Sequence, residues 1–150
     1  MMKANKVRNE IWISDGSIAR EEGDQYDHVI TLSRDDGPLD RFGSHEDTTQ
    51  HVPLYDGPQT DQDDFNRAVG VTMKAIRSDG DMLIHCQAGV SRSATVLITA
   101  LAEIDDATFD EIHSELYSAR PSIEPNPALK KLALEFLGEG YTFDESGVKQ

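Results

Sequence analysis

The chain has 150 residues, of which 28 are Asp or Glu and 14 are Lys or Arg, so its formal net charge is -14. This charge excludes nucleic acid as a default partner, because binding to a phosphate backbone needs clustered Lys and Arg. The hydrophobic share of 37% indicates a folded chain rather than a disordered one. The length predicts a single domain over residues 1–150, with a core at about residues 9–137 between polar tails.

The acidic residues occur in short dispersed clusters such as Glu21-Glu22 and Asp105-Asp106, and Lys is scarce. This pattern resembles the surface of a protein from a halophile, and the alternative is an ordinary acidic cytosolic protein. The single cysteine can form no internal disulfide, so the chain needs no oxidising compartment. Neither a signal-peptide core nor an apolar run of membrane-spanning length is present, since the longest run covers only residues 96–102. We predict a cytoplasmic monomer that does not bind membranes.

The first half of the chain predicts short strands. Residues 10–13 and 26–32 are rich in β-branched and aromatic side chains, and turn formers follow each run. Residues 51–55 predict a return to extended structure, which Asp56-Gly57-Pro58 ends. The polar stretch between residues 33 and 50 contains two glycines and one proline, which predicts an irregular surface loop.

The second half predicts helices and one further strand. Asp61 or Gln62 can cap a helix that ends at Ser78-Asp79-Gly80, because apolar residues recur between them at helical spacing. An apolar strand at 81–85 follows. Further helices are expected at 94–104, 109–117 and 128–137, and the first of these is apolar almost all round, which places it in the interior. This order predicts an α/β fold with a small central mixed sheet flanked by helices.

The most informative segment is His85-Cys86-Gln87-Ala88-Gly89-Val90-Ser91-Arg92-Ser93, between the predicted strand and the interior helix. Backbone N–H groups in such a loop can converge on one anion, and the helix N-terminus adds partial positive charge. This setting lowers a thiol pKa from ~8.5 to roughly 3.5–7.5, and the thiolate is the nucleophile. A lone cysteine at a strand end is often only a small buried hydrophobe, but the neighbouring His, Gly, Arg and Ser favour an anion-binding nucleophile.

This segment resembles the H-C-x5-R-S/T signature of the cysteine-dependent protein tyrosine phosphatase superfamily and is most similar to its dual-specificity branch. Residues 120–126, Arg-Pro-Ser-Ile-Glu-Pro-Asn, independently resemble the R-P-x-x-x-P-N element that follows the signature loop in that family. The resemblance extends over about residues 9–137 and implies the dual-specificity phosphatase fold.

The resemblance also implies a role for each residue of the signature. Cys86 would be the nucleophile that forms a phosphocysteine, and Ser93 would donate a hydrogen bond to the thiolate when water expels it. Two possibilities stay open for His85, which either tunes the thiol pKa and orders the loop or is a histidine packed at a strand end. The phosphoryl oxygens would be held by the Arg92 side chain and by the backbone N–H groups of Gln87, Ala88, Gly89, Val90, Ser91 and Arg92.

Hydrolysis of a phosphate monoester also needs an acid to protonate the leaving oxygen. Residues 52–56, Val-Pro-Leu-Tyr-Asp, resemble the I/V-P-x-x-D segment that contains the general acid in dual-specificity phosphatases. Asp56 is therefore the candidate acid and, in the second step, the base for the attacking water. An Asp before Gly is also a common turn former, and Asp61, Asp63 and Asp64 are competitors that we expect to rim the mouth of the pocket together with Asp56.

We therefore expect a phosphomonoesterase that needs no metal or cofactor and acts on phosphorylated protein at phosphotyrosine and phosphoserine or phosphothreonine. The five spacer residues lack Lys, unlike those of phosphoinositide-directed relatives, which disfavours a lipid headgroup. No segment resembles the tyrosine-recognition loop of the strictly tyrosine-specific branch. The alternatives are a phosphate-binding pseudophosphatase or interaction module, and a rhodanese-type sulfurtransferase, which also uses a loop cysteine.

Overall fold

The computed structural model describes residues 3–34, 49–139, 144–145 and 147–148. The strands are β1 (Asn5–Arg8), β2 (Ile11–Ser14), β3 (His28–Thr31), β4 (Thr49–His51), β5 (Met82–His85), β6 (Asp144–Glu145) and β7 (Gly147–Val148). The helices are α1 (Gly16–Glu22), the short 3-10 helix η1 (Gly23–Gln25), α2 (Gln62–Arg77), α3 (Arg92–Asp105), α4 (Phe109–Ala119) and α5 (Pro127–Leu137).

Five strands form one mixed sheet in the order β1-β2-β5-β3-β4. β1 runs antiparallel to β2, whereas β2, β5, β3 and β4 are parallel to their neighbours. β6 and β7 form a separate antiparallel pair. The predicted α/β fold, with a small mixed sheet flanked by helices, is confirmed.

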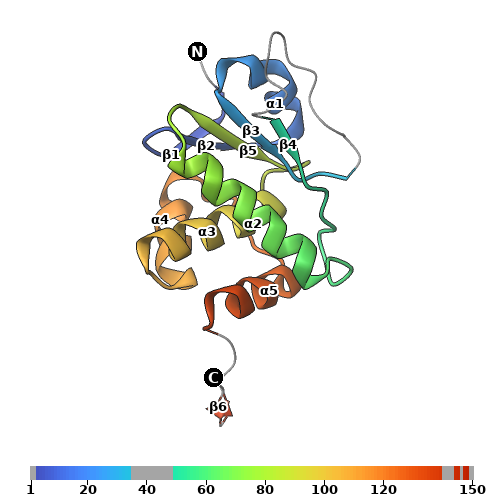
Figure 1. Ribbon diagram of the computed structural model, residues 1–150, viewed down its shortest axis with the longest axis vertical. Coiled ribbons are helices and arrows are strands. Elements are labelled where there is room, and N and C mark those ends of the chain that lie inside the picture. Colours follow the sequence, from blue (N-terminus) through green and yellow to red (C-terminus); the bar gives the residue numbers. More distant parts are fainter. Residues whose placement is uncertain (1–2, 35–48, 140–143, 146, 149–150) are drawn as a thin grey trace.

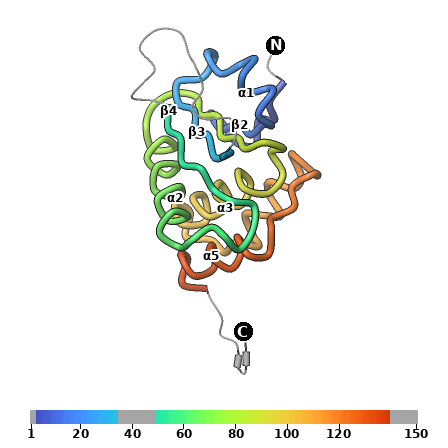
Figure 2. The backbone as a smooth tube through the Cα atoms, turned by 90° about the vertical axis from the view of Figure 1, so that its right-hand side faces the viewer, coloured from blue at the N-terminus to red at the C-terminus, as the bar shows by residue number. Residues whose placement is uncertain are grey.

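Helices cover both faces of the sheet (Figure 1). On one face, Ala19 of α1 packs in a small buried cluster with Val29 and Leu83. On the other face, α2, α3, α4 and α5 pack over a larger core that includes Ile30 and Ile84. Adjacent residues of β3 and β5 thus serve opposite faces, as the two-residue period of a strand requires. Figure 2 shows the same arrangement from the side, with the strands between α1 and the other helices.

Helix α3 lies at the centre of the larger core. All ten residues from Ser93 to Ala102 are buried, and α3 packs against α2, α4 and α5. Strand β5 is also buried along its whole length. The connection between them, residues 86–91, is therefore held by buried elements at both ends.

Strands β2, β3 and β5 and helices α2 to α5 correspond to predicted elements. Extended residues 51–55 belong to a strand only at His51, and beyond it Val52 and Leu54 donate backbone bonds to the end of β3 and to Leu32. β1 and α1 were not predicted, although Asp15 caps α1 by accepting from the Ile18 N–H at 2.8 Å. Most of the predicted surface loop and much of the predicted polar tail after residue 137 lie outside the described residues.

Within the part of the chain that the structure describes, no helix is long and apolar enough to cross a bilayer. The same residues contain no cluster of three His, Cys, Asp or Glu side chains suited to a metal ion.

Candidate active site

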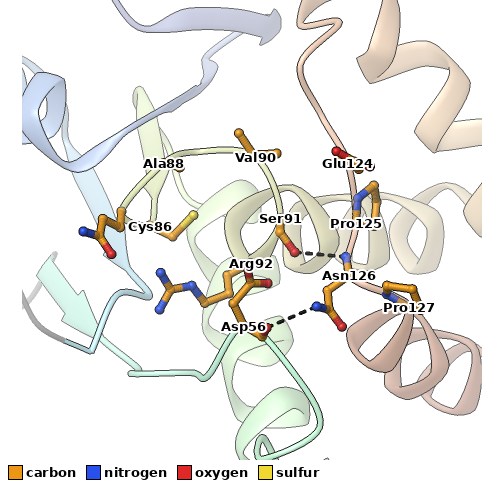
Figure 3. Close-up of a pocket in the computed structure, with 11 residues that line it drawn as sticks. Asp56, Cys86, Ala88, Val90, Ser91, Arg92, Glu124, Pro125, Asn126 and Pro127 are labelled. Carbon is orange, nitrogen blue, oxygen red and sulfur yellow. Dashed lines mark hydrogen bonds between the residues drawn. The ribbon is translucent and has the colours of Figure 1, made fainter.

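A pocket of about 570 Å³ opens where the parallel strands end (Figure 3). Ligand sites of α/β sheets lie at the carboxyl ends of the strands, and Cys86 directly follows β5, the central strand. The extended segment that leads to Asp56 follows β4. The lining residues are Asp56, Cys86, Gln87, Ala88, Val90, Ser91, Arg92, Glu124, Pro125, Asn126 and Pro127.

Cys86 is only 2% exposed, yet it lines this pocket. Its Sγ accepts a hydrogen bond from the Gly89 backbone N–H at 3.3 Å and lies 3.2 Å from the Ser93 Oγ. The sulfur therefore lies beside a backbone donor, a hydroxyl group and the N-terminus of α3. The structure therefore brings Cys86 and Ser93 into direct contact, and their chemical roles stay predictions.

The carbonyl groups of the loop between Cys86 and Arg92 are bonded from outside the loop. The Gln87, Ala88, Gly89 and Val90 oxygens accept from Gly16 N at 3.0 Å, Arg120 Nη2 at 3.4 Å, Arg120 Nε at 2.9 Å and Glu124 N at 2.9 Å, respectively. In a planar trans peptide the N–H points away from the C=O. The following N–H groups therefore point the other way, toward the pocket side, as the bond from Gly89 N–H to the Cys86 sulfur shows.

Gly89 is required at its position in this loop. Its φ of 70° lies in the left-handed region, and a Cβ there would lie 2.6 Å from the Ser14 carbonyl oxygen and 2.8 Å from the Arg120 Nη2. Only glycine satisfies both the conformation and the close approach. The end of β2 and the Arg120 side chain thus pack directly against the loop.

The first residue of α3, Arg92, lines the pocket and donates from Nη1 to the Leu54 carbonyl oxygen at 3.0 Å. A guanidinium has five donors in a fixed fork, so this bond leaves donors for an anion. Ser91 gives α3 no side-chain cap, because its Oγ instead accepts from the Asn126 backbone N–H at 2.9 Å. Of the predicted anion-binding residues, all except Gly89 line this pocket.

Among the carboxylates of residues 56–64, only Asp56 lines the pocket. Asp61 caps α2 by accepting from the Asp64 N–H at 2.8 Å, and Asp63 and Asp64 lie in the exposed first turn of that helix. The expectation that all four rim the mouth is wrong, because the other three form the cap and first turn of α2 and do not line the pocket. Glu124 supplies the other carboxylate of the lining.

His85 is completely buried in β5, and its Nε2 lies 2.8 Å from the Thr31 Oγ1 on β3. This contact agrees with a histidine packed at a strand end. An effect of His85 on the thiol pKa stays a prediction.

Two residues of the R-P-x-x-x-P-N element, for which the sequence predicts no role, contact the site. Asn126 connects the loop after Cys86 with the segment of Asp56. Its backbone N–H donates to Ser91, and its Nδ2 donates to the Asp56 carbonyl oxygen at 3.1 Å (Figure 3). Arg120 binds the carbonyl groups of Ala88 and Gly89 from behind the loop. The sequence shows the motif, but it does not show these contacts, which join residues at least 31 positions apart.

Residues 14–137 match the family model described as dual specificity phosphatase, catalytic domain. Dual specificity protein phosphatase 12 of Mus musculus is 29% identical over 149 residues, which cover 95% of this chain and 44% of that protein. Dual specificity protein phosphatase 19 of Mus musculus is 39% identical over 83 residues, which cover 55% of this chain and 38% of that protein. The chain therefore spans less than half the length of these curated relatives.

Solved structures share the fold. The crystal structure of human DUSP28 has a TM-score of 0.75 at 22% identity and covers 91% of this chain and 93% of its own. A mouse putative dual specificity phosphatase complexed with zinc tungstate has a TM-score of 0.77 at 23% identity, with coverage of 93% and 89%.

Proposed function

The chain belongs to the dual-specificity phosphatase catalytic-domain family, and from this premise we propose that it hydrolyses phosphate monoesters on phosphorylated proteins through a phosphocysteine on Cys86. The observation that supports this most directly is the sulfur of Cys86, which contacts the Gly89 N–H and the Ser93 hydroxyl within the pocket that Arg92 and Asp56 also line. Nucleophile, anion-binding groups and a carboxylic acid are the parts that such a reaction needs.

In the first step, the thiolate of Cys86 attacks phosphorus, the S–P bond forms and the bond to the leaving oxygen breaks. Asp56 gives its proton to that oxygen, so the substrate hydroxyl leaves neutral. We call residues 86–92 the phosphate loop. The N–H groups of residues 87–92 and the Arg92 side chain bind the three phosphoryl oxygens. These donors are already in place before the substrate arrives.

In the second step, the Asp56 carboxylate removes a proton from water, whose oxygen attacks phosphorus. The S–P bond breaks, its electron pair returns to the Cys86 sulfur and inorganic phosphate leaves. Ser93 donates to the departing thiolate, which its 3.2 Å distance to the sulfur permits. Asp56 is then protonated again and ready for the next cycle.

We assign phosphorylated proteins rather than phosphoinositides as substrates. Arg92 is the only Lys or Arg among the described residues that line the pocket, whereas Asp56 and Glu124 contribute carboxylates. A headgroup with several phosphates would need more cations. The dual-specificity family membership supports action on phosphotyrosine and on phosphoserine or phosphothreonine.

We also assign this activity to a monomer in a salt-rich cytoplasm, as in a halophile. The net charge of -14 and the single cysteine support this setting. The pseudophosphatase alternative is not favoured, because cysteine, arginine, serine and a candidate acid are all present and assembled around one pocket.

The test is release of phosphate from para-nitrophenyl phosphate and from matched phosphotyrosine, phosphoserine and phosphothreonine peptides in the presence of EDTA. We expect hydrolysis of all four, inhibition by vanadate and no turnover by Cys86→Ser. A strict requirement for Mn²⁺ or Mg²⁺ would contradict the thiolate mechanism. A parallel incubation with thiosulfate and cyanide tests the sulfurtransferase alternative, for which we expect no thiocyanate.

A further inference from the structure

Arg120, the residue that ends α4, connects three separate parts of the chain. Its Nε and Nη2 donate to the carbonyl oxygens of Gly89 and Ala88 at 2.9 and 3.4 Å, and its Nη1 donates to the Oδ1 of Asn5 in β1. β1 and α4 lie side by side (Figure 1). Arg120 does not line the pocket, so it reaches the phosphate loop only from behind.

The two carbonyl groups held by Arg120 determine which way two N–H groups of the loop point. The peptide planes 88–89 and 89–90 present the N–H groups of Gly89 and Val90 opposite to these oxygens. A rotation of either plane would turn a carbonyl oxygen toward the phosphate and remove a donor. Such a rotation is easiest beside Gly89, because glycine adopts both signs of φ at little cost.

Only arginine can fill this position fully. Its planar fork presents donors to two consecutive carbonyl groups and to a third acceptor at once, whereas a lysine ammonium is a compact point charge on a flexible stem. Asn5 completes the arrangement, because its side-chain oxygen fixes the end of the fork that does not bind the loop.

Arg120 also brings charge close to the nucleophile. Burial lowers the pKa of its guanidinium, while the Asp15 carboxylate and the Cys86 sulfur act in the opposite direction. An arginine pKa starts so high that the group remains charged at neutral pH. The phosphate loop therefore has a cation on each side, Arg92 in the pocket and Arg120 behind.

We propose that Arg120 is a positioning residue for the phosphatase reaction and that Asn5 of the N-terminal strand β1 holds it in place. Through this pair, β1 helps to keep the N–H groups of the phosphate loop directed at the phosphate. The inference rests on the proposed function for its catalytic consequence, while its effect on anion binding is measured independently.

The test compares Arg120→Met, Arg120→Lys, Asn5→Ala and Asn5→Asp with the unaltered protein. For each, kcat and KM for para-nitrophenyl phosphate, the Kd for tungstate by calorimetry and the Tm are measured. We expect Arg120→Met to lower kcat/KM by ~10²-fold, the scale of losing one oriented oxyanion donor, and to weaken tungstate binding. The kcat/KM of Arg120→Lys should lie between the values of Arg120→Met and the unaltered protein, because lysine restores the charge without the planar fork.

The Asn5 pair separates positioning from bulk stability. Asn5→Ala should lower kcat/KM by about threefold to tenfold, as expected for one lost hydrogen bond to a charged group, and Asn5→Asp should restore it by replacing the acceptor. Equal kcat/KM for Asn5→Ala and Asn5→Asp would overturn the proposal. This comparison also decides the case if Arg120→Met does not fold.

Arg8→Met is the matched control. Arg8 lies on β1 together with Asn5, but it bonds Glu115 and Asp105 at 2.7 Å, away from the phosphate loop. It should lower Tm and leave kcat/KM and tungstate affinity unchanged. An equal loss of kcat/KM in Arg8→Met and Arg120→Met would contradict a positioning role. Absence of turnover in the unaltered protein would refute the phosphatase function, while the tungstate affinities would still test the arrangement.

Discussion

Cys86 and Asp56 reach the same pocket from segments that are built in opposite ways. Cys86 lies between a strand that is buried throughout and a helix whose residues 93–102 are all buried. Asp56 is exposed, five residues beyond β4, in a turn that Thr60 closes through two hydrogen bonds with the Tyr55 backbone. One half of the site is fixed by the core and the other by a few polar contacts.

This difference matches what the proposed function requires of each half. An anion site stabilises a transition state only if its donors are already oriented, which burial and the outward bonds of the phosphate loop provide. In the proposed reaction the general acid would meet leaving oxygens that differ between phosphotyrosine and phosphoserine, and an exposed loop suits that role better. Two contacts join the halves, from Arg92 to the Leu54 carbonyl and from Asn126 to the Asp56 carbonyl.

Substitutions in the rigid half should have the largest effect. In the proposed mechanism, Cys86→Ser removes the nucleophile and Arg92→Ala removes the side chain that binds the phosphate. We expect kcat/KM to fall by more than ~10⁴-fold in each, toward the loss seen when a catalytic nucleophile is removed. Steady-state hydrolysis of para-nitrophenyl phosphate measures this. Turnover within tenfold of the unaltered protein in Cys86→Ser would refute the nucleophile assignment.

A substitution in the exposed half should be milder. Asp56→Asn should lower kcat by about 10²–10⁴-fold, the usual contribution of general acid–base catalysis, and should flatten the basic limb of the pH–rate profile. The matched control is Asp61→Asn, which keeps a residue able to cap α2 and should leave kcat unchanged. If Asp61→Asn abolishes turnover while Asp56→Asn does not, the acid has been assigned to the wrong residue.

A substitution of Ser93, also in the rigid half, should affect the two steps of the proposed reaction differently. Its hydroxyl contacts the sulfur, so Ser93→Ala should slow breakdown of the phosphocysteine more than its formation, by about 10- to 10²-fold, as expected for a hydrogen bond to a charged group. Stopped-flow kinetics should then show a burst of nitrophenol followed by slow turnover. Loss of the burst together with the steady state would instead place Ser93 in formation of the intermediate or in folding.

Salt should have the smallest effect and should act outside the enclosed loop. Raising KCl to 1 M shortens the Debye length to ~3 Å, which screens repulsion among surface carboxylates and between Asp56, Glu124 and an incoming phosphate. We expect Tm and kcat/KM to rise together, kcat/KM by less than about tenfold. A Tm that is flat or falls with KCl would refute the halophile interpretation and leave the phosphatase assignment untouched.

The sequence by itself predicts the half of the site around Cys86. Cys86, the phosphate loop and Ser93 are consecutive, and the strand before them and the helix after them are recognisable from apolar runs. Residues that are neighbours in the sequence remain neighbours in the fold. A nine-residue segment therefore predicts both the anion site and the strand and helix around it. Asp56 is predicted as the acid only through a resemblance to a family segment, because several neighbouring Asp residues have equivalent local patterns.

Tertiary structure alone decided which groups converge on that segment from elsewhere. Asp61 caps α2 and does not line the pocket, whereas Glu124, from a segment distant in the sequence, does line it. The contact between Asn5 and Arg120 joins residues 115 positions apart, and strand β1 itself is polar enough to resemble a tail. Such contacts depend on how separate elements pack, and hydrophobic periodicity, which specifies elements one at a time, contains no information about them.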